Sequence, residues 1–127
     1  MTARPTARAQ LAAIAVAVSL AGCGPPPPQA PPSQAKKLDA STSDLSTECG
    51  LAYQVTAFPG DHRKDLANLE TQAMASARSL ASVYHRNPDW IYQGATVGQI
   101  VTDALSMLHA CGLTQAERTL RRATSRV

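Results

Sequence analysis

The apolar residues between positions 61 and 87 recur at steps of three and four, which is the spacing of one face of an α-helix. Asp61 follows Gly60 and is a suitable N-cap, because its carboxylate can accept from the free amides of a first turn. Asn87 and Pro88 end the pattern, since the residue before a proline is pushed out of the helical region. The sequence therefore predicts a helix here, with a buried stripe of Leu66, Leu69, Ala73, Ala77, Leu80 and Tyr84.

Three further segments carry helical patterns, at about 43–58, 96–111 and 114–126. The second opens on "TVGQ", a capping box of Thr96 and Gln99, and ends at Gly112, a suitable C′ residue. "TQAE" at 114–117 predicts another box and a short polar helix. Strand signals are nearly absent, so we predict an all-α fold, a small three- or four-helix bundle of helical hairpins. The expected stripes are Leu45, Cys49, Ala52, Tyr53 and Thr56, then Val97, Ile100, Val101, Ala104, Leu105, Leu108 and Cys111.

The first 22 residues have a different pattern. Arg4 and Arg8 precede the apolar run "LAAIAVAVSL" at 11–20, which is too short to cross a bilayer and matches the apolar region of a signal peptide. The alternative is an alanine-rich buried helix. Leu20-Ala21-Gly22-Cys23 resembles the lipobox of bacterial lipoproteins.

The resemblance implies cleavage before Cys23 and a lipid on its sulfur, so the protein would be anchored to a membrane of the bacterial cell envelope. Gly24 is not the aspartate that retains such proteins at the inner membrane in enteric bacteria. We therefore expect the outer membrane, facing the periplasm, if the host has one, and otherwise the outer face of the cell membrane. The alternative is ordinary cleavage near Ala21, which would leave a soluble protein with a free Cys23.

Six prolines without a charge between them occupy "GPPPPQAPPSQA" at 24–35. Such a segment favours the extended polyproline II conformation and predicts a semi-rigid spacer, closed by Lys36 and Lys37. A ligand for a proline-binding groove is the other interpretation. We divide the chain into a signal peptide at 1–22, a lipidated cysteine with a Pro-rich linker at 23–37, and a helical domain at 38–127.

If Cys23 carries the lipid, Cys49 and Cys111 remain as a pair in an oxidising compartment, and we predict a disulfide that joins the first helix of the domain to the third. Two free buried thiols are the alternative. The whole-chain charge of +3 falls when Arg4 and Arg8 leave with the signal peptide. We expect no nucleic-acid partner. Arginines near the C-terminus complement a helix dipole or meet an anionic partner: Arg118, Arg121, Arg122 and Arg126.

The three histidines, His62, His85 and His109, have no metal-ligand spacing, and we predict neither a metal nor a cofactor. No serine lies in a nucleophile motif, although catalytic triads assemble in space rather than in sequence. "NPDWIYQG" at 87–94 places three large apolar residues in a connection between helices. They form an interaction surface or close the end of the bundle: Trp90, Ile91 and Tyr92.

Three function classes remain. We predict a non-enzymatic envelope lipoprotein that acts as a protein-interaction or accessory module with an envelope protein partner. The alternatives are a helical module that binds a hydrophobic ligand, and an enzyme of the envelope. "GPPPPQAPP" also resembles small proline-rich lipoproteins of phage lysis and conjugation systems.

Overall fold

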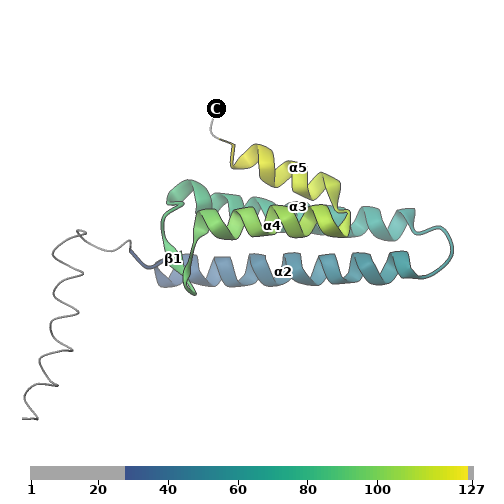
Figure 1. Cartoon of the computed structure of the whole chain (residues 1–127), viewed down its shortest axis with the longest axis horizontal. Helices are drawn as coiled ribbons and strands as arrows, with labels where there is room; N and C mark the ends of the chain where they lie inside the picture. Colours follow the sequence, from purple (N-terminus) through teal and green to yellow (C-terminus); the bar gives the residue numbers. More distant parts are fainter. Residues whose placement is uncertain (1–27, 126–127) are drawn as a thin grey trace, which may run out of the picture.

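A computed structural model describes residues 28–125, which form four helices and one two-stranded hairpin (Figure 1). The all-α fold is confirmed. Within this range no helix is long and apolar enough to cross a membrane. The predicted signal peptide, Cys23 and Arg126 lie outside the described residues. The elements are α2 (Pro32–Ala57), α3 (Arg63–Arg86), β1 (Ile91–Tyr92), β2 (Ala95–Thr96), α4 (Val97–Cys111) and α5 (Thr114–Ala123).

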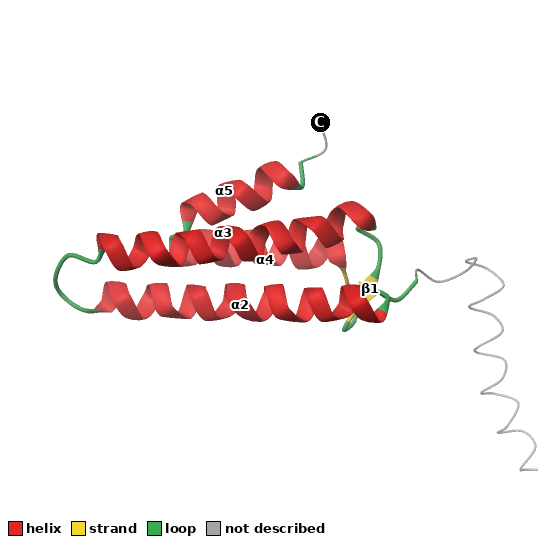
Figure 2. Ribbon diagram, turned by 180° about the vertical axis from the view of Figure 1, so that it is seen from behind, coloured by secondary structure: helices red, strands yellow, loops and turns green. Residues whose placement is uncertain are grey.

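The three longer helices run along one axis. From the hairpin end of the bundle, α2 runs to the far end, α3 returns, and α4 runs away from the hairpin again (Figures 1 and 2). The short α5 turns back and packs against α3 and α4. We call the end where α2 meets α3, opposite the hairpin, the distal end. The core takes residues from each predicted stripe, among them the fully buried Leu45, Ala73, Ala77, Leu80, Val97 and Leu108. It also includes Leu38, Leu113 and Leu120, which were not predicted, whereas Thr56 of the first predicted stripe is exposed.

The first helix begins earlier than predicted. Pro31 is its N-cap and Pro32 its first residue, so the predicted linker at 23–37 is wrong from position 32 onward. Proline suits the first helical position because its missing N–H would have no intrahelical partner there. Leu38 is fully buried, and it lies two turns before Leu45 on the same stripe. The composition indicated a spacer, but this apolar position extends the helix.

The helix ends follow the sequence at some positions and depart from it at others. The Thr96–Gln99 capping box is confirmed, with both hydrogen bonds formed at 3.0 and 2.9 Å. Gly112 ends α4 in the left-handed conformation, also as predicted. Asp61 is not the N-cap of α3, which is His62, although Asp61 Oδ1 accepts from the Arg63 amide at 3.0 Å.

The second predicted capping box, at 114–117, does not form. Helix α5 begins at Thr114 after Leu113, and no side chain of its own segment caps it. Glu70 of α3 takes that role. Its two carboxylate oxygens accept from the amides of Gln115 and Ala116, each at 3.0 Å. The cap therefore comes from a residue 45 positions away in the chain, which no local motif could indicate. The helix also ends at Ala123 rather than near Arg126.

The predicted disulfide is confirmed. Cys49 of α2 and Cys111 at the end of α4 are bonded, with their Cα atoms 5.5 Å apart. This distance is typical of disulfides. The bond closes a loop across 62 residues and joins the first helix of the domain to the third.

The hairpin between α3 and α4 was not expected from the sequence. Ile91 pairs with Thr96, and Tyr92 pairs with Ala95. The turn residues Gln93 and Gly94 both have positive φ, as two-residue hairpin turns require. Strands of two residues are too short for a period-two pattern, so the sequence could not reveal them.

Candidate functional site

The residues that the sequence singled out at 90–92 lie at the hairpin end and are half-buried. Trp90 and Tyr92 pack against the core. The Tyr92 hydroxyl donates to Asp39 Oδ1 of α2 at 2.9 Å. Loss of solvent around the ring, together with this hydrogen bond, raises the pKa of Tyr92, so the hydroxyl stays protonated as a donor.

The backbone of Ile91 is also engaged. Its amide donates to the Pro28 carbonyl and its carbonyl accepts from the Ala30 amide, both at 2.9 Å. Gln29 thereby forms a parallel bridge with Ile91, beside the hairpin. The segment 28–30, which the sequence placed in a semi-rigid spacer, is thus hydrogen-bonded to Ile91, about 60 positions further along the chain. These contacts favour the interpretation in which residues 90–92 close the end of the bundle.

Among residues 28–125, the large apolar side chains with the most exposure lie on the second half of α2 and just after it. Leu51, Tyr53 and Phe58 are 40%, 55% and 67% exposed. Sequence reasoning missed Leu51 and Phe58, and it placed Tyr53 in the core. In the structure Tyr53 reaches over the end of α4, where its hydroxyl donates to the Ala110 carbonyl at 3.1 Å.

Leu51 and Val55 are one turn apart on α2, and Phe58 follows the helix as its C-cap in an extended conformation. We call these three residues the distal surface. Next to it, Leu51 and Val55 line a groove of about 220 Å³ with residues of α3. The α3 residues are Asp65, Asn68 and Leu69.

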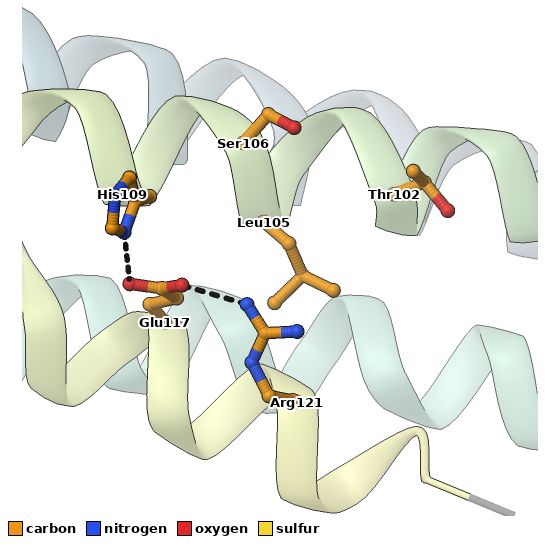
Figure 3. A pocket seen from close by; sticks show the side chains of 6 residues that line it. All are labelled: Thr102, Leu105, Ser106, His109, Glu117 and Arg121. Atoms are coloured by element: carbon orange, nitrogen blue, oxygen red, sulfur yellow. Dashed lines mark hydrogen bonds and ion pairs between the residues drawn. The ribbon is translucent and has the colours of Figure 1, made fainter.

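A more polar cleft of about 450 Å³ lies between α4 and α5 (Figure 3). Glu117 lines this cleft, with only 13% of its side chain exposed. One carboxylate oxygen accepts from Arg121 at 2.7 Å, and the other lies 3.3 Å from Nδ1 of His109. The hydrogen bond from Arg121 is the main cause that lowers the pKa of Glu117. Thr102, Leu105 and Ser106 complete the lining.

Ser106, His109 and Glu117 are the residue types of a hydrolytic triad, but their geometry differs from one. A nucleophile must lie within hydrogen-bond reach of its base. The Ser106 hydroxyl is turned away from the imidazole (Figure 3). Glu117, His109 and Arg121 instead satisfy one another and join α4 to α5.

A third groove, between α2 and α4, bears on the hydrophobic-ligand alternative. Its volume is about 240 Å³, which is below the roughly 300 Å³ at which small-molecule sites begin. Its lining is largely apolar and consists of Thr42, Leu45, Ile100, Asp103, Ala104 and Met107.

The three histidines do not lie together at one site. His62 bonds the Phe58 carbonyl at 2.6 Å, His85 contacts the Ala123 carbonyl, and His109 pairs with Glu117. Among residues 28–125, no group of three or more histidine, cysteine or acidic side chains is arranged to hold a metal ion.

One carboxyl group lies inside the helix pair α2–α3. Glu48 is 7% exposed, and its Oε2 accepts from the Ser76 hydroxyl at 3.4 Å. Its other oxygen meets no donor in the part of the chain that the structure describes. Burial raises the pKa of Glu48, and the nearby charge of Asp44 adds to this effect, against the opposing hydrogen bond from Ser76.

Comparisons of the chain with known protein families, with curated protein sequences and with solved structures found no match.

Proposed function

We propose that this chain is a lipoprotein of the bacterial cell envelope, anchored through Cys23, and that its helical domain works as a non-enzymatic protein-interaction or accessory module. The lipobox-like Leu20–Cys23 supports the anchor. The disulfide between Cys49 and Cys111 supports export, because such bonds persist in oxidising compartments. In a host with two membranes, the anchor lies in the outer one and the domain faces the periplasm.

The observation that carries the interaction role is the distal surface. Phe58 is 67% exposed and Leu51 is 40% exposed, and Leu51 lines a groove that an apolar side chain of a partner could enter. Aromatic residues such as Phe58 are enriched in the cores of protein interfaces. In the polar cleft, by contrast, the charged groups already pair with one another across α4 and α5, which gives them a structural role.

A photo-cross-linker tests the interface in the native host. A benzophenone amino acid replaces Phe58 in the lipidated protein, and it replaces Ile91 in a matched control. We expect a discrete adduct with one envelope protein from position 58, weakened by Leu51→Asn. Leu51 is exposed, so this substitution leaves the melting temperature nearly unchanged. An adduct from position 91 alone moves the interface to the hairpin end, and no adduct from either position contradicts the interaction role.

The anchor is tested separately. Cys23→Ser is compared with wild type for the mass of the mature N-terminus and for the distribution between membrane and soluble fractions. We expect the wild type in membranes with a diacylglyceryl mass on Cys23, and the serine variant unprocessed. A serine variant that is still cleaved and still membrane-bound contradicts the lipobox interpretation.

A further inference from the structure

The point at which the chain leaves the bundle is fixed by backbone hydrogen bonds. Residues 28–30 lie against Ile91, so the described domain starts at the hairpin end. This start lies only five residues after Cys23. A chain of five residues spans at most about 18 Å when fully extended. An attachment at Cys23 therefore keeps the hairpin end of the bundle within about 18 Å of the attachment point.

The distal surface lies far from this point. Helix α2 is 26 residues long, which corresponds to about 39 Å of helix. It begins at the hairpin end, and Phe58 follows its last residue at the distal end (Figure 1). A tether at the hairpin end keeps that end near the attachment and allows the distal end to lie about 39 Å of helix away.

The distribution of charged residues along α2 also favours an arrangement in which the hairpin end faces the lipid. Lys36 and Lys37 are exposed in its first turns, and every charged residue that follows on the helix is acidic. These acids are Asp39, Asp44 and Glu48. Arg86 is also exposed at the hairpin end, where α3 ends. At the hairpin end these three cations lie beside two exposed acids, Asp39 and Asp89, which leaves a net positive charge there to meet anionic headgroups. Laying α2 along such a surface would bring the exposed Asp44 against it, whereas Glu48 is buried.

We infer that the hairpin end of the bundle faces the lipid surface, and that the bundle stands upright with the distal surface held away from the membrane. This inference rests on the proposed lipidation of Cys23. Its partner is the layer of lipid headgroups, contacted by Lys36, Lys37 and Arg86. The same arrangement presents Leu51 and Phe58 to proteins beyond the membrane surface.

The single tryptophan of the sequence, Trp90, lies at the hairpin end and provides the measurement. The full lipidated chain is reconstituted into phosphatidylethanolamine–phosphatidylglycerol vesicles that carry a dansyl group on some headgroups. Energy transfer from tryptophan to dansyl falls steeply with distance. We expect transfer from Trp90 to exceed, several-fold, the transfer in the double variant Trp90→Phe, Phe58→Trp, whose tryptophan is at the distal end.

A second variant keeps the wild-type domain and tests the tether alone. Insertion of ten Gly-Ser residues between Cys23 and Pro28 should lower transfer from Trp90, because the hairpin end can then move away from the headgroups. Equal transfer from positions 90 and 58 would mean that the bundle lies flat, with the exposed Arg118 and Arg122 of α5 on the lipid, and would overturn the inference. Unchanged transfer after the insertion would overturn it as well.

The intact mass of the same samples reports lipidation independently. An unlipidated mature chain would overturn the proposed function and this inference together. A lipidated chain with equal transfer from both positions would overturn the inference alone.

Discussion

Reduction of the Cys49–Cys111 bond is expected to remove a large part of the stability of the domain. The bond closes a loop across 62 residues, and the chain-entropy relation assigns such a loop roughly 4 kcal/mol at 25 °C. A domain of this size loses about 4–8 °C of melting temperature for each kcal/mol. We therefore expect the melting temperature to fall by roughly 20 °C, while the reduced Cys49 stays buried as a small apolar side chain.

The measurement is thermal and urea unfolding of the full chain with and without reductant, followed by circular dichroism. Because the cross-link acts mainly on the unfolded chain, reduction should slow refolding more than it speeds unfolding. The variant Cys49→Ala, Cys111→Ala reports the same loss without reductant. Cys23→Ser serves as the control, since that residue lies outside the closed loop. A reduced protein within about 1 kcal/mol of the oxidised one would refute the reasoning, because the loop would then contribute little of the entropy assigned to it.

Three further predictions concern single side chains. Glu48→Gln should raise the melting temperature at pH 7, because the raised pKa of Glu48 means that the folded state favours the neutral carboxyl. The contribution of this carboxyl to stability falls as pH rises through that pKa, so the melting temperature of the variant should exceed that of wild type by more at pH 7 than at pH 4. Glu70→Gln should lower the free energy of unfolding in urea by about 1–2 kcal/mol, because α5 loses its charged cap. Asp65→Asn on the same helix is the control, and an unchanged urea midpoint for Glu70→Gln would contradict the capping role of Glu70. Thr96→Ala should cost about 1 kcal/mol and Thr96→Ser less, because serine keeps the oxygen that accepts from Gln99; equal losses would contradict the cap assignment.

The sequence predicted the helices because their signals are local. Leu69, Ala73 and Leu80 repeat at helical spacing and are buried as expected, while Leu66 and Tyr84 at the two ends of the stripe are only partly buried. The Thr96–Gln99 box and Gly112 are also local signals, since the residues that bond one another lie within one turn. The disulfide was predictable because the proposed export context left two cysteines on apolar stripes.

The features that the sequence did not predict depend on contacts between distant segments. Glu70 caps a helix 45 positions away, and residues 28–30 dock on Ile91. Neither contact produces a periodic pattern of residues in the sequence. Tyr53 follows the apolar spacing of α2 but lies at its edge, because α4 ends beside it and leaves its ring uncovered. The exposure of Leu51 and Phe58 was not predicted either, because exposure depends on which neighbouring elements cover a position, and an apolar stripe does not record that.

The disulfide divides the domain into a covalent ring, residues 49–111, and two arms outside it. The exposed connection Phe58–Asp61 lies within the ring. A protease that cuts there leaves both fragments joined through Cys49 and Cys111, so the nicked protein stays one molecule as long as the surroundings are oxidising. A cut between Pro28 and Glu48 releases the whole ring from the N-terminal segment instead. A cut in the exposed connection Phe58–Asp61 therefore leaves the protein in one piece, whereas a cut in the first half of α2 separates residues 49–111 from the N-terminal segment.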